Sequence, residues 1–278
     1  MKIFLEHFAY VILMVLVGML AFAQDNPVDR ATVPFSNPSQ PGYVKASVHN
    51  GGITVKGYDG KEVIVEARVR EKILTEDKKM SERAKGMRLI QIATTGLTIE
   101  EENNVMEVSV QSLKRTVDLT IQVPYSTSLN LNSFNNGDII VEKVNGETEV
   151  NNHNGALKLT DVSGSTVAHT FNGDVLVSFS KVDSEKPMSF SNWNGDIDVT
   201  FPPDIKANVK MKSTQGNIYS DYEISIMQDP TKVVEDSRKK GGKYRISFGK
   251  YIYGTINGGG PEFQFNTFNG DIFIRKAK

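Results

Sequence analysis

Apolar and polar residues alternate along most of the chain from Tyr43 to the C-terminus, and short turns interrupt the alternation. The stretch 171–180, FNGDVLVSFS, shows the unit: an Asn-Gly turn, then a run in which every second residue is apolar. Side chains on a strand point alternately to its two faces, so this pattern is typical of strands with one buried face. The sequence therefore predicts an all-β fold.

The Asn-Gly turn recurs at a nearly constant interval. Glycines 137, 155, 173, 195 and 216 are separated by 18 to 22 residues, and weaker turns fall between them at Gly146 and Gly164. Self-similarity at a fixed period is the signature of repeat architectures. We expect a β-solenoid of stacked 18–22-residue coils, whose corners include Asn136, Gly137, Asn172, Gly173, Asn194, Gly195, Asn269 and Gly270.

Two columns of aliphatic residues support this interpretation. Two residues after the turn glycines stand Ile53, Ile139, Leu157, Val175, Ile197, Ile218 and Ile272. Four residues after them stand Val55, Val141, Leu159, Val177, Val199, Ser220 and Ile274. Both columns share one strand face, so stacked coils would form continuous aliphatic ladders in the core.

Three segments depart from the repeat. Residues 24–42 are rich in Pro, Asn and Ser, which is typical of an extended, flexible lead-in. Residues 71–89 contain helix-forming residues and predict a short helical insertion. Residues 226–243 are charged and predict a second insertion, a loop with about one helical turn. The expected repeat domain is 43–278.

One outward column is unusually apolar. Three residues after the glycines stand Ile140, Lys158, Leu176, Asp198, Tyr219 and Phe273. Either a second layer covers this face or the face binds a partner. We favour a cover formed by the helical segment and the strands of residues 90–123.

The turn residues themselves have structural roles in this prediction. Asn before Gly tolerates the turn geometry, and stacked coils would align the Asn amides into a hydrogen-bonded ladder. The Asp that follows Gly in four units, as Asp174 and Asp196 do, is interpreted as a cap that accepts backbone N–H groups. Calcium binding by this column is the weaker alternative, because only one Asp occurs per coil.

Two residues before the glycines lies a column with several aromatic members: Asn135, His153, Phe171, Trp193, Thr214 and Phe268. Phe171 and Trp193 on neighbouring coils would form a platform for sugars or peptides, which makes Phe171, Trp193 and His153 the candidate ligand-binding residues. The alternative is that these rings pack against each other. Trp193 is the only tryptophan.

Residues 1–23 combine Lys2, a continuous apolar run and a small-residue Ala-Phe-Ala end, which is typical of a secretory signal peptide. An uncleaved N-terminal anchor is the alternative. We expect a periplasmic, cell-surface or secreted protein that is not inserted in the membrane after signal cleavage.

Composition excludes several kinds of chemistry. The chain has no cysteine, which rules out disulfides, thiolate metal sites and a cysteine nucleophile. Its formal net charge of −1 does not suggest a nucleic-acid partner. No catalytic motif, phosphate-binding loop or dinucleotide fingerprint occurs, and His49, His153 and His169 match no familiar metal spacing. We expect no enzyme activity, no cofactor and no metal site.

The order of these segments resembles a bacterial family of unknown function known as "putative adhesins". The residues that carry the resemblance are the repeats of 117–175, with Val123-Pro124 before the first, and the closing INGGGPEFQFNTFNGDIFI with Gly258-Gly259-Gly260. The resemblance implies an exported right-handed β-solenoid without established catalytic residues. Together these observations predict a non-enzymatic binding or structural module of the cell envelope, with a surface glycan or protein as its partner. A carbohydrate-active solenoid enzyme and an envelope-associated sensor are the alternatives.

Overall fold

The computed structural model describes residues 28–70, 94–227, 233–236, 244–247 and 251–278. All regular structure in these residues is β-strand, and none of them belongs to a helix that could cross a bilayer. The predicted all-β class is therefore confirmed. The signal peptide at 1–23 and the helical insertion at 71–89 lie outside the described residues and stay predictions.

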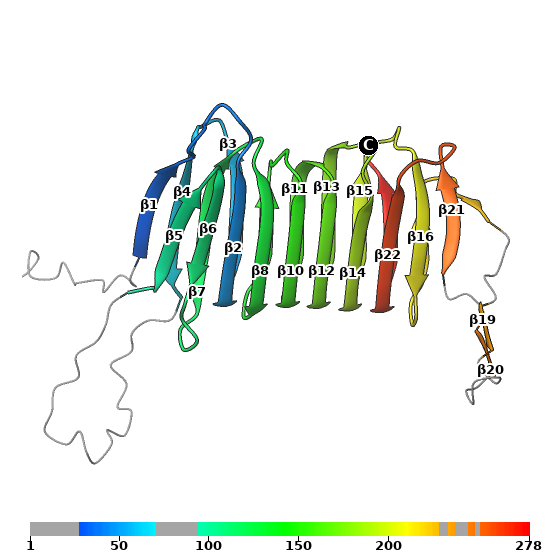
Figure 1. Cartoon of the computed structure of the whole chain (residues 1–278). Helices are drawn as coiled ribbons and strands as arrows, with labels where there is room; N and C mark the ends of the chain where they lie inside the picture. The colour runs from blue at the N-terminus through cyan, green and yellow to red at the C-terminus, as the bar shows by residue number, and fades with distance from the viewer. Residues whose placement is uncertain (1–27, 71–93, 228–232, 237–243, 248–250) are drawn as a thin grey trace, which may run out of the picture.

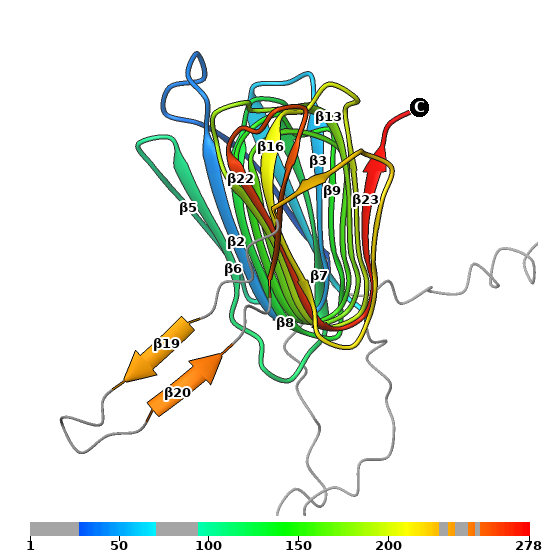
Figure 2. The same ribbon diagram turned by 90° about the vertical axis from the view of Figure 1, so that its right-hand side faces the viewer.

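Two large sheets face each other across one core (Figures 1 and 2). We call the ten-stranded sheet A and the eleven-stranded sheet B. In spatial order, sheet A consists of β1 (Val28–Pro34), β4 (Glu62–Val69), β7 (Val117–Pro124), β3 (Ile53–Tyr58), β9 (Ile139–Glu142), β11 (Leu157–Gly164), β13 (Val175–Val182), β15 (Ile197–Phe201), β23 (Ile272–Lys276) and β17 (Ile218–Ser220).

Sheet B, again in spatial order, consists of β18 (Ser225–Ile226), β21 (Ile252–Ile256), β16 (Ala207–Ser213), β22 (Glu262–Asn269), β14 (Met188–Asn194), β12 (Thr166–Asn172), β10 (Thr148–Asn154), β8 (Ser128–Asn135), β2 (Tyr43–Asn50), β6 (Val105–Val110) and β5 (Leu97–Glu102). Strands β19 (Val233–Asp236) and β20 (Tyr244–Ser247) pair only with each other among the described strands. The predicted insertion at 226–243 thus contains strand β19 where a loop was expected.

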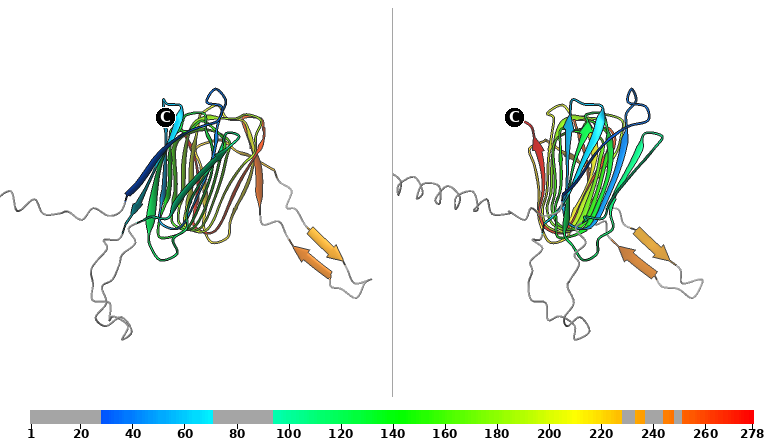
Figure 3. Two further views of the ribbon diagram at one scale, coloured as in Figure 1. Left: turned by 60° about the vertical axis from the view of Figure 1, so that its left-hand side comes forward. Right: turned by 90° about the vertical axis from the view of Figure 1, so that its left-hand side faces the viewer.

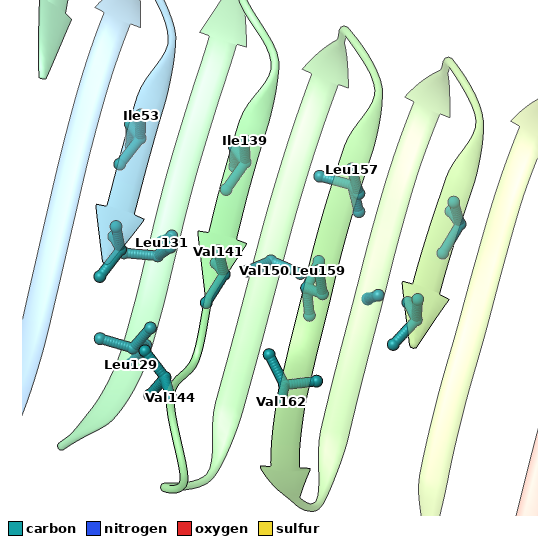
Figure 4. Close-up of a cluster of buried hydrophobic side chains, with 14 of the residues drawn as sticks. Ile53, Leu129, Leu131, Ile139, Val141, Val144, Val150, Leu157, Leu159 and Val162 are labelled. Atoms are coloured by element: carbon teal, nitrogen blue, oxygen red, sulfur yellow. The ribbon is translucent and has the colours of Figure 1, made fainter. Parts of the chain in front are cut away.

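The middle of the molecule is a regular stack of coils. Each coil contributes one strand to each sheet, as in β8–β9, β10–β11, β12–β13 and β14–β15, and neighbouring coils pair in parallel. Both predicted aliphatic columns face the core, where Ile139 lies beside Leu157 and Val141 beside Leu159 (Figure 4). The solenoid-like fold is therefore confirmed, and Ser220 is the exposed exception in the second column.

At both ends the chain order and the spatial order differ. After β14–β15 the chain forms β16–β17 one place further out, then returns so that β22–β23 lies between the two coils (Figure 1). The N-terminal end has the same feature, because β6–β7 lies outside β2–β3 although β8–β9 follows it in the chain. The long gap between the last two turn glycines is the length of chain that makes this return.

Antiparallel strands end both sheets at the N-terminal end of the stack and sheet B at the C-terminal end. Strand β4 pairs with β7 and β1 with β4 in sheet A, whereas β5 pairs with β6 and β21 with β16 in sheet B. The prediction of a flexible lead-in over 24–42 was wrong for 28–34, because these residues form β1 and pair antiparallel with β4. Views toward the N-terminal side show the two layers with these end strands (Figure 3).

The outward apolar column of sheet A is not covered by the strands of residues 97–124. Strands β5, β6 and β7 add to the N-terminal end of the two sheets, because their own alternating residues extend the same core. Leu176 and Tyr219 stay 38% and 49% exposed, and the Tyr219 ring stacks on Phe273. The expected covering layer was therefore wrong as far as these strands are concerned.

Candidate binding face

Six aromatic rings form a continuous ladder along one corner of sheet B. Neighbouring ring centroids lie 4.3 to 5.9 Å apart, and neighbouring planes are inclined by only 5° to 17°. This spacing follows from the distance of about 4.8 Å between paired strands. In spatial order, the ring ladder consists of His49, Phe134, His153, Phe171, Trp193 and Phe268.

The ring ladder contains residues that the turn alignment misplaced. Asn136 is an extra residue at its corner and has a φ of 64°, so the backbone register pairs Asn135 with Asn50. This shift brings Phe134, rather than Asn135, into the ring column. At the other end, the returning strand β22 places Phe268 next to Trp193, where the chain order suggested Thr214.

Because the rings stack on each other, most of their faces are covered and cannot contact a ligand. Phe171 has His153 over one face and Trp193 over the other, and Trp193 has Phe171 and Phe268. Their exposed fractions of 38% and 46% therefore consist mainly of ring edges. The interior rings pack against each other, as the alternative interpretation held, and they form an apolar ridge instead of a platform of open faces.

The turn residues make two parallel ladders beside this ridge. In the amide ladder each Asn side chain donates from Nδ2 to the preceding Oδ1 over 2.7 to 3.4 Å, through Asn135, Asn154, Asn172, Asn194 and Asn269. In the carboxylate column the Oδ1 atoms accept a backbone N–H of the next coil over 2.7 to 2.9 Å, at Asp118, Asp138, Asp174, Asp196 and Asp271. The predicted amide ladder and the capping role of the Asp residues are thus present, with Asn135 in the place expected for Asn136.

A third column, which the sequence interpretation missed, lies inside the corner. Its side chains donate to the carbonyl oxygen of the turn glycine on the preceding coil over 2.8 to 3.3 Å, and its members are Ser133, Asn152, Thr170, Asn192, Thr267 and Ser213. A buried carbonyl without a partner is costly, which explains why polar residues interrupt the core alternation here. The signal was visible as Ser, Asn or Thr three residues before most of the turn glycines.

The outer face of sheet B carries a polar stripe next to the ring ladder. Each member lies two residues before a ring, and the stripe consists of Ser47, Asn132, Asn151, His169, Ser191 and Asn266. His169 Nδ1 lies 2.9 Å from Ser191 Oγ, so neighbouring members contact each other. The stripe offers amide, hydroxyl and imidazole groups once per coil.

At its N-terminal end the polar stripe enters a groove of about 440 Å³ between β5, β6, β2 and β8. The groove is lined by Ser47, Asn130, Asn132, Thr98, Glu100 and Gln111, together with the ion pair of Lys45 Nζ and Glu107 Oε1 at 2.9 Å. The hydrogen bond from Lys45 to Glu107 raises the pKa of the lysine above its ordinary value. The groove is therefore polar and carries charges of both signs.

The histidines His153 and His169 are not brought together on this face. His153 belongs to the ring ladder, whereas His169 lies in the polar stripe on the next coil. Among the residues that the structure describes, no three His, Asp or Glu side chains are grouped so that they could hold a metal ion. What the geometry provides is a long, rigid face with repeated contact groups.

Stacked coils with ladders of turn residues along one corner define this chain as a solenoid-like β-repeat module. A family model matches residues 44–247, and the chain belongs to the family described as Toastrack DUF4097. The matched segment includes the N-terminal end coils and the regular middle. It ends before β22 and β23, the strands that return into the stack.

Comparison with solved structures finds proteins of the same extent at low identity. A "putative cell adhesion protein" from Clostridium sporogenes is 12% identical with a TM-score of 0.40, and the alignment covers 90% of this chain and 100% of that one. A "putative adhesin" from Bacteroides fragilis is 8% identical with a TM-score of 0.32, over 90% and 97% of the two chains. No curated protein matches the chain.

Proposed function

We propose that the protein is an exported, non-enzymatic binding module of the cell envelope whose contact surface is the outer face of sheet B. The observation that supports this proposal is the continuous run of ring ladder, polar stripe and groove along one side of a rigid stack. Solenoids commonly use such extended surfaces for binding, because every coil presents the same groups at the same spacing. The signal peptide predicted over residues 1–23 supplies the route out of the cytoplasm.

The chemistry of the face favours a surface glycan as the ligand. The polar stripe presents neutral amide and hydroxyl groups, exemplified by Asn151 and Ser191, which donate to and accept from sugar hydroxyls. Its period of about 4.8 Å suits a polymer that also repeats. A compact partner would use only a few coils, whereas a linear chain can contact all of them and end in the groove.

In this proposal the ring ladder does not act as an open aromatic platform. His153, Phe171 and Trp193 present ring edges and form an apolar wall along one side of the polar stripe, against which C–H groups of a ligand pack. Only the two end rings have a ring neighbour on one side alone. One of them, His49, follows Val48, whose partner Val110 precedes the groove residue Gln111.

A glycan array tests the proposal with the mature protein and three matched variants. The double variant Asn151→Ala/His169→Ala removes two outward groups of the polar stripe without touching the core. The control Thr54→Ala/Thr200→Ala removes two outward groups of sheet A. We expect the wild type and the control to bind the same glycans and the stripe variant to lose most of the signal. Trp193→Phe keeps a ring and should retain binding.

Two results would contradict the proposal. If the wild type binds no glycan on the array, the ligand class is wrong. If the stripe variant binds as the wild type does, the contact surface is wrong. Release of new reducing ends from a bound glycan would contradict the non-enzymatic character and favour a carbohydrate-active enzyme.

A further inference from the structure

The chain contains eight Asn-Gly pairs, and one of them differs from the others in its contacts. In seven pairs the Asn side chain makes a hydrogen bond: Asn50, Asn145, Asn154, Asn172, Asn194, Asn257 and Asn269. The side chain of Asn136 is exposed and makes none within the part of the chain that the structure describes. Asn136 is also the extra residue at its corner, where Asn135 takes the place in the amide ladder.

The glycine that follows Asn136 differs from the glycines of four other pairs. The backbone N–H groups of Gly51, Gly155, Gly173 and Gly195 donate to a carbonyl of the neighbouring coil over 2.8 to 2.9 Å. The N–H of Gly137 makes no such bond within the described residues. In the Asn136-Gly137 pair, the side-chain amide is therefore exposed, and no hydrogen bond within the described residues holds either it or the peptide nitrogen.

A cation lies on the peptide group that joins these two residues. Arg70 Nη1 donates to the carbonyl oxygen of Asn136 over 2.5 Å, and Asp118 orients the guanidinium by accepting from Arg70 Nε at 2.8 Å. When the Gly137 nitrogen loses its proton, the negative charge is shared with this same carbonyl oxygen. A guanidinium donor at that oxygen stabilises the anion and so increases the supply of the nucleophile.

From these three features we propose that Asn136-Gly137 is a site of self-modification, at which the side-chain amide is converted to a carboxylate through a cyclic imide. Solvent hydroxide removes the Gly137 N–H proton, the nitrogen forms a bond to Cγ of Asn136, and the side-chain amine leaves with a proton as ammonia. Water then adds to either imide carbonyl and opens the ring to aspartate or isoaspartate. One water is consumed and one ammonia is released, with no other reactant.

The position tolerates the product better than the ladder positions would. Asn136 already interrupts the regular corner, so a backbone lengthened by isoaspartate changes no hydrogen bond of the amide ladder. The guanidinium of Arg70, which is paired with Asp118, contacts the backbone carbonyl of the same residue and not its side chain. The same reaction at Asn172 would remove a donor from the middle of the ladder.

Peptide mapping of the folded protein tests the proposal. The mature protein is incubated in mildly alkaline buffer, and aspartate and isoaspartate are located by mass spectrometry with electron-transfer fragmentation. A parallel sample in urea provides the intrinsic rate of each Asn-Gly pair. We expect Asn136 to react in the folded protein at least about tenfold faster than Asn154, Asn172 and Asn194, because those pairs react only after local opening.

Two variants separate the role of Arg70 from simple accessibility. Arg70→Gln should slow the reaction at Asn136 several-fold in the folded protein and leave its rate in urea unchanged. Asn136→Gly accepts the positive φ and should abolish the product without changing the melting temperature. Equal rates at Asn136 and Asn172 in the folded protein would overturn the proposal, and an unchanged rate in Arg70→Gln would overturn the part assigned to the guanidinium.

Discussion

The middle of the stack and its two ends are built by different rules. From β8 to β15 each coil follows the previous one in both chain and space, and every strand pair is parallel. At the ends, the coils β6–β7 and β16–β17 lie outside their sequence successors, and β1, β4, β5, β18 and β21 pair antiparallel. The comparison shows how a repeat is terminated. An antiparallel strand ends the run of coils because it cannot repeat the corner.

The middle and the ends of the stack also differ in the number of stabilising contacts that each coil makes. A middle coil has a neighbour on each side at every ladder, so each of its corner groups makes two contacts. An end coil has such a neighbour on one side only. Equivalent substitutions should therefore destabilise the protein more in the middle of the stack than at its ends.

The largest effect is expected for a charge in the middle of the core. Val177 is 4% exposed and belongs to the second aliphatic column, so Val177→Asp would bury an unpaired charge that costs several kcal/mol. We expect loss of the cooperative thermal transition measured by circular dichroism. Val33→Asp in the end strand β1 should leave a cooperative transition at a lower temperature, and outward Leu176→Asp should change it least. A cooperative melt of Val177→Asp near the wild-type temperature would contradict the coil assignment.

A methyl group at a middle corner should have the next largest effect. A Cβ on Gly173 would lie 2.3 Å from the carbonyl oxygen of Gly155, and the φ of Gly173 is 144°. Clash and strain together predict that Gly173→Ala loses about 1–3 kcal/mol or more. At the C-terminal end, a Cβ on Gly258 meets nothing within 4 Å, so Gly258→Ala has only the strain of its φ of 87°. Chemical denaturation compares the two, and an equal loss of stability would contradict the close stacking of the corners.

The ring ladder offers a smaller test of the same asymmetry. Trp193 stacks on two rings and His49 on one. Since an aromatic pair contributes about 0.5–1.5 kcal/mol beyond burial, Trp193→Ala should lose about twice as much pair energy as His49→Ala. The control Trp193→Phe should lose the least. If His49→Ala is as destabilising as Trp193→Ala, the ladder does not act as a series of pairwise contacts.

The smallest effect is expected at low pH, where the N-terminal end of the stack should become less stable than the middle. Hydrogen bonds from the backbone and side chain of Ser36 lower the pKa of Glu101 from its ordinary 4.5, and the Thr95 hydroxyl and N–H lower the pKa of Asp29 from 3.8. Both pKa values are lower in the folded state than in the unfolded state. The stabilisation is therefore complete at a pH above the ordinary pKa values, and it is lost as the pH falls through the lowered pKa values. Both contacts hold the segment around β1.

Hydrogen exchange measured by mass spectrometry checks this prediction. Peptides from 28–34 should exchange faster, relative to peptides from 188–201, once the pH falls below about 4. Glu101→Gln should produce part of the effect at neutral pH. Equal loosening of both peptides would show that these carboxylates do not stabilise the end specifically.

The sequence predicts the middle of the stack better than its two ends. The aliphatic columns, the coil length and the Asn and Asp ladders depend on neighbours in the chain, and they were predictable because residues such as Val175 and Ile197 keep one register. The contact of Trp193 with Phe268 was not predictable, because it depends on a return of the chain over many residues. A repeat alignment assumes that successive units are adjacent.

The candidate site shows the same limit on a smaller scale. Phe171 and Trp193 were correctly placed on neighbouring coils, but the sequence did not show that their faces are covered. The single extra residue Asn136 moved Phe134 into the ring ladder, and a one-residue bulge of this kind leaves no periodic signal. The inward column at Thr170 and Asn192 was overlooked because polar residues at core positions look like breaks in the pattern.

The insertion of the last coil between two earlier ones is the central claim, and engineered cysteine pairs test it most directly in this cysteine-free chain. Asp198 pairs with Phe273, and Phe273 in turn pairs with Tyr219. Adjacent strands lie about 4.8 Å apart, within disulfide range, whereas strands two places apart lie beyond it. We expect Asp198→Cys/Phe273→Cys to form a disulfide on mild oxidation and Asp198→Cys/Tyr219→Cys to form none. A disulfide in the second pair and none in the first would contradict it.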